Sequence, residues 1–239
     1  MRTFIRNLFL ICIVAVSMQS CNDEGYSLGD FYVSYATIVR ESSSTYTLRL
    51  DSGEKLWIGA GYLNYPGVEG QRVIADFTLL GDEYEGYDHI VKVNNLYEIL
   101  TKPIEEINTE EEDIEFGNDG LPSINKIWLG GGYLNIKFTH ILPIKELHRV
   151  SIVQNKLIEY PDDEYIYLEF RYNTYNDLSD YILNSIASFS LNNIDLKEKK
   201  GLKISWLDHK NVEHIEELEL TNISILPEKD KRRENTNLF

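Results

Sequence analysis

The sequence predicts an all-β protein with two domains, a small five-stranded barrel followed by an antiparallel β-sandwich. Two observations lead to this prediction. Short stretches alternate apolar and polar residues at period two, which is the pattern of half-buried strands. A run of acidic residues near the middle then divides these stretches into two groups. The chain has 239 residues, 43% of them hydrophobic, which suffices for one or two packed domains.

The first domain is expected to span residues 30–104 and to contain five strands. Their expected bounds are 31–40, 46–50, 55–60, 72–80 and a last strand that starts at 89 and runs toward 100. The order of hairpin, long connection and hairpin suits a five-stranded OB-type barrel. An SH3-like barrel or a small sandwich would give a similar pattern.

Residues 105–121 are predicted to form an acidic linker. Residues 105–115 contain seven acidic side chains and no basic side chain, and like charges that repel keep a chain extended and solvated. The acidic residues are Glu105, Glu106, Glu110, Glu111, Glu112, Asp113 and Glu115. Few contacts are expected across such a segment, so it should also be the preferred site of limited proteolysis.

The second domain is expected to span residues 122–227. Seven short strands separated by turn residues predict an antiparallel sandwich. Their expected positions are 127–129, 134–138, 148–155, 165–172, 185–191, 202–207 and 212–220. Residues 176–183 are expected to form one short helix, and the polar residues 228–239 a fraying tail.

The first 20 residues have the features of a signal peptide. Arg2 and Arg6 precede an apolar run at 8–16, which is too short to span a bilayer. Ser20 before Cys21 resembles a bacterial lipobox, in which the signal is cut before the cysteine and the thiol is acylated. Residues 21–29 would then form the lipidated N-terminus and its tether. The alternative is an ordinary secretory peptide with an incidental cysteine.

The lipid would hold the mature chain on a membrane. Asn22-Asp23-Glu24 follow directly after Cys21, and acidic residues in this place resemble the signal that exports lipoproteins of the Bacteroides group to the cell surface. We therefore expect an outer-membrane lipoprotein, with surface exposure as the finer expectation. Cys12 and Cys21 are the only cysteines, so the mature chain has no disulfide. The formal net charge of −16 repels phosphate backbones and excludes nucleic acid as a partner.

Several short motifs occur in a defined order along most of the chain. They are YSLGDF at 26–31, GQRV at 70–73, GYDH at 86–89, VKVN at 91–94, ILTKP at 99–103, IWLGG at 127–131, YLN at 133–135 and YLEFR at 167–171. As an ordered set they resemble the NigD-like lipoproteins of Bacteroides relatives. The resemblance implies an N-terminal OB-type domain and a C-terminal β-sandwich. It brings no established activity and no catalytic residues.

No catalytic, cofactor or metal site is predicted. The five histidines lack the spacing of a zinc site, and a glycosidase carboxylate pair cannot be singled out among 39 acidic residues. Four acidic side chains at 82–88 could hold calcium through hard oxygens, but the EF-hand spacing is missing and a charged strand connection is the simpler interpretation.

Aromatic residues give the one candidate binding site. Tyr62 and Tyr65 lie in a Gly-rich loop, and Trp57 leads into it. Exposed rings of this kind stack on sugars or anchor protein contacts. The alternative is that the loop packs onto its own barrel and that Trp57 belongs to the core.

The functional expectation is a non-catalytic lipoprotein of the bacterial cell envelope with no cofactor. It would bind a protein partner or serve a structural role. The alternative is a surface glycan-binding module of a polysaccharide-uptake system.

Overall fold

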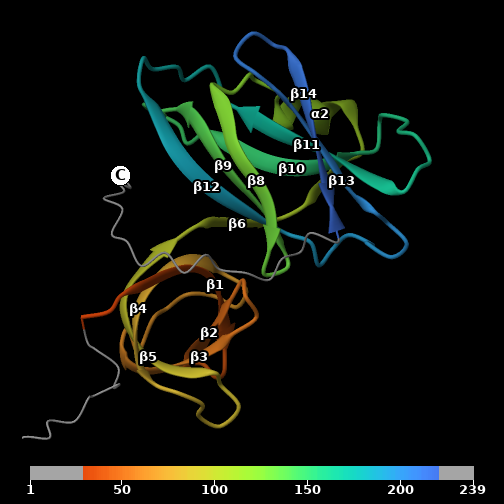
Figure 1. Ribbon diagram of the computed structural model, residues 1–239. Helices are drawn as coiled ribbons and strands as arrows, with labels where there is room; N and C mark the ends of the chain where they lie inside the picture. The colour runs from red at the N-terminus through yellow and green to blue at the C-terminus, as the bar shows by residue number, and fades with distance from the viewer. Residues whose placement is uncertain (1–28, 221–239) are drawn as a thin grey trace, which may run out of the picture.

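A computed structural model describes residues 29–220, and Figure 1 shows a barrel joined to a two-sheet sandwich. The predicted signal peptide, the lipidation residue Cys21 and the polar tail 228–239 lie outside these residues. No helix between residues 29 and 220 is both long and apolar enough to cross a membrane.

The barrel confirms the prediction of an OB-type fold. Its strands are β1 (Tyr32–Arg40), β2 (Tyr46–Leu50), β3 (Lys55–Gly61), β4 (Arg72–Gly81) and β5 (His89–Glu98). They close in the order β1-β2-β3-β5-β4, with β3 and β5 parallel, which is the OB arrangement. Alternate residues point inward and are buried, among them Ile38, Leu48, Leu56, Val73 and Val91. The period-two pattern therefore places every second side chain in the barrel core and the others on its outer face.

The sandwich is also confirmed, with more strands than expected. One sheet has the order β14-β13-β11-β10-β7 and the other β6-β12-β9-β8. The strands are β6 (Leu100–Pro103), β7 (Glu105–Ile107), β8 (Ser123–Gly130), β9 (Tyr133–Ile141), β10 (Arg149–Asn155), β11 (Tyr165–Asn173), β12 (Ile182–Ser190), β13 (Gly201–Leu207) and β14 (Glu213–Glu219). Buried apolar side chains such as Leu134, Phe138, Leu168, Phe170 and Phe189 fill the space between the sheets.

The antiparallel arrangement expected from the sequence holds for four strand pairs of the sandwich, while three other pairs are parallel. These are β6 with β12, β7 with β10, and β11 with β13. The last pair is parallel because the chain leaves β11, crosses to the other sheet as β12 and returns as β13 in the original direction. Such a crossover leaves no mark on the apolar pattern of the individual strands.

Residues 105–121 are not an extended linker. They contain β7 and the helix α2 (Glu110–Phe116), which starts with a capping box between Thr109 and Glu112. Arg171 Nη2 lies 2.6 Å from Asp113 Oδ1, and Arg149 contacts α2 in the same way. Four acidic residues in its first turn also suit the helix dipole. The prediction failed because the basic partners lie tens of residues away in sequence.

The helix expected at 176–183 is absent from the structure. Tyr175 and Asn176 have φ values of 52° and 61°, and β12 begins at Ile182. The Asp177 carboxylate instead accepts hydrogen bonds from three successive backbone N–H groups at residues 144–146. A short acidic side chain that satisfies a neighbouring loop competes with helix formation.

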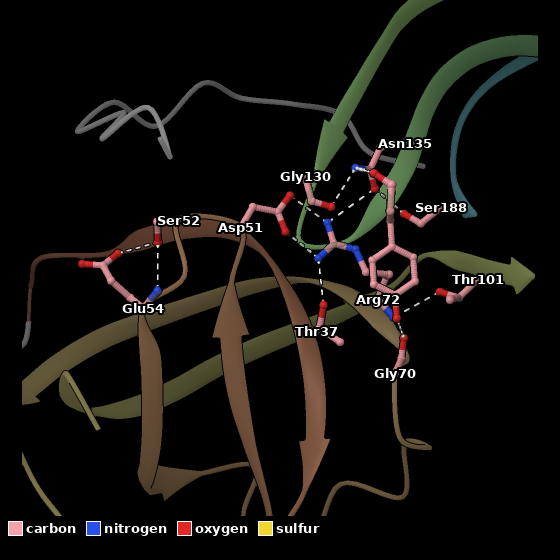
Figure 2. A network of polar contacts seen from close by, with 11 residues as sticks. Thr37, Asp51, Ser52, Glu54, Gly70, Arg72, Thr101, Gly130, Asn135 and Ser188 are labelled. Carbon is pink, nitrogen blue, oxygen red and sulfur yellow. Dashed lines mark hydrogen bonds and ion pairs between the residues drawn. The ribbon is translucent and has the colours of Figure 1, made fainter. Parts of the chain in front are cut away.

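A buried arginine joins the barrel to the sandwich (Figure 2). The Arg72 side chain is fully buried and donates to both carboxylate oxygens of Asp51, at 2.6 and 2.8 Å. It also donates to Thr37 in the barrel and, at 3.4 Å, to Asn135 on β9. Its guanidinium carbon lies 5.0 Å from the ring centre of Tyr133. Arg72, paired with Asp51 inside the barrel, thus contacts the β8–β9 hairpin of the sandwich through Asn135 and Tyr133.

Candidate functional site

The turn between β4 and β5 places two tyrosines side by side. Tyr84 and Tyr87 exchange backbone hydrogen bonds of 3.1 and 2.9 Å, so they close a two-residue hairpin. Glu85 and Gly86 between them have φ values of 47° and 88°, which is the left-handed geometry of a type I′ turn. Opposite residues of such a hairpin carry their side chains on one face, so the two rings point the same way.

Trp57 lies against both rings. On β3 it stands between the buried residues Leu56 and Ile58, so its indole is on the outside of the barrel. Its ring centre is 5.6 Å from that of Tyr84 and 5.2 Å from that of Tyr87, with both rings tilted. Tyr84 is 38% exposed. We call Trp57, Tyr84 and Tyr87 the Trp57 cluster.

The Trp57 cluster lies on the side of the barrel that OB folds generally use for binding. That side is made by strands 2 and 3 together with the β1–β2 and β4–β5 connections. Here Trp57 is on β3, and both tyrosines are in the β4–β5 connection. The Tyr87 hydroxyl donates to Glu41 Oε1 at 2.9 Å, which ties this connection to the start of the β1–β2 connection.

Carboxylates dominate the strand ends and turns near the cluster. They are Glu41, Glu54, Asp82, Glu83, Glu85 and Asp88. Burial and the hydrogen bond to the Glu41 carboxylate raise the pKa of the Tyr87 hydroxyl above its ordinary value. Asp88 accepts from the backbone N–H of Lys55, and His89 lies within 4.0 Å of Glu54 and Asp82. Between residues 29 and 220, no three potential ligands converge on a metal position.

The structure does not bring Trp57 together with Tyr62 and Tyr65. The Tyr62 ring is 44% exposed, and its hydroxyl donates to Asn95 at 3.1 Å. Trp57 pairs with Ile90 on the same strand β5, five residues from Asn95, or about 17 Å along a strand. The three aromatic residues proposed from the sequence therefore do not form one site.

Tyr65 has a packing role. Its ring lies 5.7 Å from that of Tyr46, it is half-buried against the barrel core, and its hydroxyl donates to the Glu98 carboxylate. Burial, then this hydrogen bond, raise the pKa of Tyr65. The hydroxyl of Tyr46 in turn donates to the carbonyl of Tyr62 at 2.5 Å. The loop is thus fastened to its own barrel, which is the alternative that the sequence left open.

Sequence reasoning missed Tyr84 and Tyr87 because it considered only the acidic side chains of residues 82–88. The available signal is Tyr-Glu-Gly-Tyr between two period-two stretches. Glycine at the second turn position favours a two-residue hairpin, and that geometry aligns the flanking rings.

Comparison with known proteins supports both domains. A family model for the NigD-like N-terminal OB domain matches residues 35–99, and one for the NigD-like C-terminal beta sandwich domain matches residues 103–220. The second match begins at the end of β6, so it includes the segment expected to be a linker. No curated protein matches the chain.

Several solved structures share this architecture. A protein from Parabacteroides distasonis ATCC 8503, described as toxin-related, is 32% identical with a TM-score of 0.68, covering 84% of this chain and 96% of that one. A Bacteroides vulgatus ATCC 8482 protein of unknown function has a TM-score of 0.70 at 24% identity, covering 79% and 90%. A NigD-like immunity protein from Bacteroides caccae ATCC 43185 has a TM-score of 0.59 at 18% identity, covering 81% and 94%. The matched domains and the toxin-related relative show that this chain belongs to the NigD-like family.

Proposed function

We propose that the chain is a non-catalytic lipoprotein of the bacterial outer membrane that binds a protein partner through the Trp57 cluster. Cys21 would carry the lipid, and the two domains would face the cell surface. A protein from Bacteroides fragilis NCTC 9343 that is described as a lipoprotein shares the fold, with a TM-score of 0.57 at 9% identity. This likeness supports the fold, while the membrane anchor rests on the residues around Cys21.

The observation that carries the proposal is the Trp57 cluster itself. It groups one tryptophan and two tyrosines on the outside of the barrel, on the face that OB folds use for ligands. Tryptophan and tyrosine are enriched among the residues that dominate the energetics of protein interfaces. The surrounding carboxylates disfavour nucleic acid as a ligand, because they repel its negatively charged phosphate backbone. A protein partner agrees with the toxin-related and immunity descriptions of two structural relatives.

A second candidate function is glycan binding, and a groove on the sandwich favours it. The groove has a volume of about 420 Å³ and lies beside the β10–β11 connection. Tyr160, Tyr165 and Tyr167 line it together with the amide side chains of Gln154 and Asn155. Rings combined with a few polar groups are typical of small-ligand sites. However, the Tyr160 and Tyr167 rings stack on each other at 4.8 Å, which covers one face of each ring.

Anchoring is tested by labelling cells with radioactive palmitate. The variant Cys21→Ser should incorporate no label, since Cys21 is the only cysteine left after signal removal. Retained label on the variant would refute the lipid anchor.

Partner binding is tested by photocrosslinking in the native cells. A benzoylphenylalanine at position 84 should give a crosslinked protein that disappears when Trp57→Ala is added. The matched control carries the crosslinker at position 181, whose tyrosine is 72% exposed on the sandwich, and should not give this product. An absent product, or one unaffected by Trp57→Ala, would refute the proposed site. Glycan-array binding that is lost in Tyr160→Ala and kept in Trp57→Ala would favour the second candidate.

A further inference from the structure

Three sites within residues 29–220 share one arrangement, in which a basic side chain lies over an aromatic ring and pairs with a carboxylate. They are Arg72 with Tyr133 and Asp51, Arg149 with Phe116 and Glu115, and Lys203 with Tyr165 and Asp163. A cation is attracted both to the face of a ring and to the negative charge beside it.

The distances are those of direct contact. The guanidinium carbon of Arg149 lies 3.8 Å from the ring centre of Phe116, and Nη1 lies 2.7 Å from the Glu115 carboxylate. Lys203 Nζ lies 4.3 Å from the ring centre of Tyr165 and 3.1 Å from the Asp163 carboxylate. The chain therefore uses this arrangement for its own packing, both in the domain interface and on the surface of the sandwich.

The Trp57 cluster has two of the three components. Its rings lie beside the Glu41 carboxylate, which accepts the Tyr87 hydroxyl, and Glu85 occupies the turn between the tyrosines. In the part of the chain that the structure describes, no lysine or arginine lies over the rings of Trp57, Tyr84 or Tyr87. Tryptophan is the ring that attracts cations most strongly.

We infer that the partner supplies the missing component, an arginine or lysine side chain that stacks on Trp57 and pairs with the carboxylates around it. This inference rests on the proposed function and adds the chemistry of the partner, a protein segment with a basic side chain at its centre. Arginine fits better than lysine, because its planar guanidinium stacks on a ring while its N–H groups reach a carboxylate.

Lys55 makes the inference more specific. It lies two residues before Trp57 on β3, so both side chains are on the outer face of the barrel. Its exposed ammonium group is the like charge that an incoming cation would meet. Removing it should strengthen binding of a basic partner and weaken binding of an acidic one.

The test is calorimetric titration of the mature chain carrying Cys21→Ser with three twelve-residue Gly/Ser peptides. One peptide carries four arginines, one four lysines, and one four citrullines, which keep the shape of arginine without its charge. The arginine peptide should bind most tightly, and the citrulline peptide at least about tenfold more weakly. Binding of the arginine peptide should weaken about tenfold between low and high salt, because exposed charges are screened.

Variants assign the binding to the cluster. Trp57→Ala, and Glu41→Gln combined with Glu85→Gln, should each weaken the arginine peptide by about fivefold or more, and Lys55→Gln should strengthen it. The matched control is Glu110→Gln with Glu111→Gln, which removes the same charge from exposed positions of α2 and should change little. Thermal melting of each variant verifies that it is folded.

Three results would overturn the inference. The first is a citrulline peptide that binds as tightly as the arginine peptide, and the second is an arginine peptide that does not bind. The third is a control variant of α2 that weakens binding as much as the cluster variants do. If the position-84 crosslink still depends on Trp57 in any of these cases, the proposed function stands and only the basic partner is refuted. If the crosslink fails as well, the proposed function falls with it.

Discussion

The Arg72 site and the Trp57 cluster are built from the same kinds of group in opposite surroundings. Each combines aromatic rings with a carboxylate on the barrel. At the domain interface the cation is Arg72, which is fully buried between Asp51 and Tyr133. At the Trp57 cluster the carboxylates are on the surface, and Tyr84 is 38% exposed.

This difference indicates that a site whose cation comes from its own chain serves stability, whereas a site without one is open to a partner. A buried carboxylate without a partner is costly, so the interface needs an arginine from its own chain. An exposed carboxylate is solvated by water and costs little free energy, so the Trp57 cluster needs no arginine from its own chain. Changes at the first site should therefore reduce the free energy of unfolding, and changes at the second should reduce binding.

Arg72→Met should give the largest loss of stability. It leaves the Asp51 carboxylate, whose side chain is only 15% exposed, without its ion pair. Removal of one member of a buried pair costs roughly 3–5 kcal/mol. Urea unfolding would measure the loss, and combining Arg72→Met with Asp51→Leu should restore part of it. A loss under about 1 kcal/mol would show that the interface does not depend on this pair.

Alkaline pH should give the next largest effect, through Tyr46 in the barrel. Burial, then the nearby Tyr62, raise the pKa of Tyr46 to about 12 from an ordinary value of 10.0. A raised folded-state pKa means that the contribution to stability is complete below pH 10 and is lost between pH 10 and 12. A difference of two pKa units corresponds to roughly 2.7 kcal/mol.

The measurement is the free energy of unfolding from urea titrations at pH 9 and pH 11.5. Tyr46→Phe should make the barrel less sensitive to this change, because the ionisable hydroxyl is gone. A pH dependence that Tyr46→Phe leaves unchanged would refute the assignment of this loss of stability to the buried Tyr46 hydroxyl.

Tyr65→Ala should destabilise more than Tyr62→Ala. Tyr65 packs on Tyr46 and the barrel core, whereas Tyr62 is 44% exposed. We expect a loss of about 1–2 kcal/mol for Tyr65 and less than about 1 kcal/mol for Tyr62, the usual range for partly buried and surface positions. Thermal melting would measure both. The reverse order would show that Tyr62, and not Tyr65, fastens the loop to the barrel.

Arg149→Ala should give the smallest effect, a local loosening of α2. Arg149 stacks on Phe116 and pairs with Glu105 and Glu115, so its loss should cost about 1 kcal/mol of local stability. Cleavage by a glutamate-specific protease within 105–121 should then be about fivefold faster, because cleavage follows the population of the open state. Rapid cleavage of the unchanged protein at this segment would support the extended linker after all.

The strands and both domains follow from local patterns, whereas the pairing of the strands does not. Val91 and Val93 alternate with polar neighbours and lie in the barrel core as expected. β6 and β7 were missed because each is only three or four residues long and the acidic side chains of the second mask its pattern. Trp57 was grouped with the loop that follows it in sequence, whereas its ring contacts Tyr84 and Tyr87 in the β4–β5 turn.

The sequence by itself determined the all-β class, the number of domains and the family, because these depend on periodicity, turn residues and ordered motifs along the chain. Only the tertiary structure decided which charges are paired and which rings meet. Arg72 with Asp51, Arg171 with Asp113, and Trp57 with Tyr84 are each separated by more than twenty residues. Long-range contacts of this kind arise from strand order and register, and local composition does not encode them.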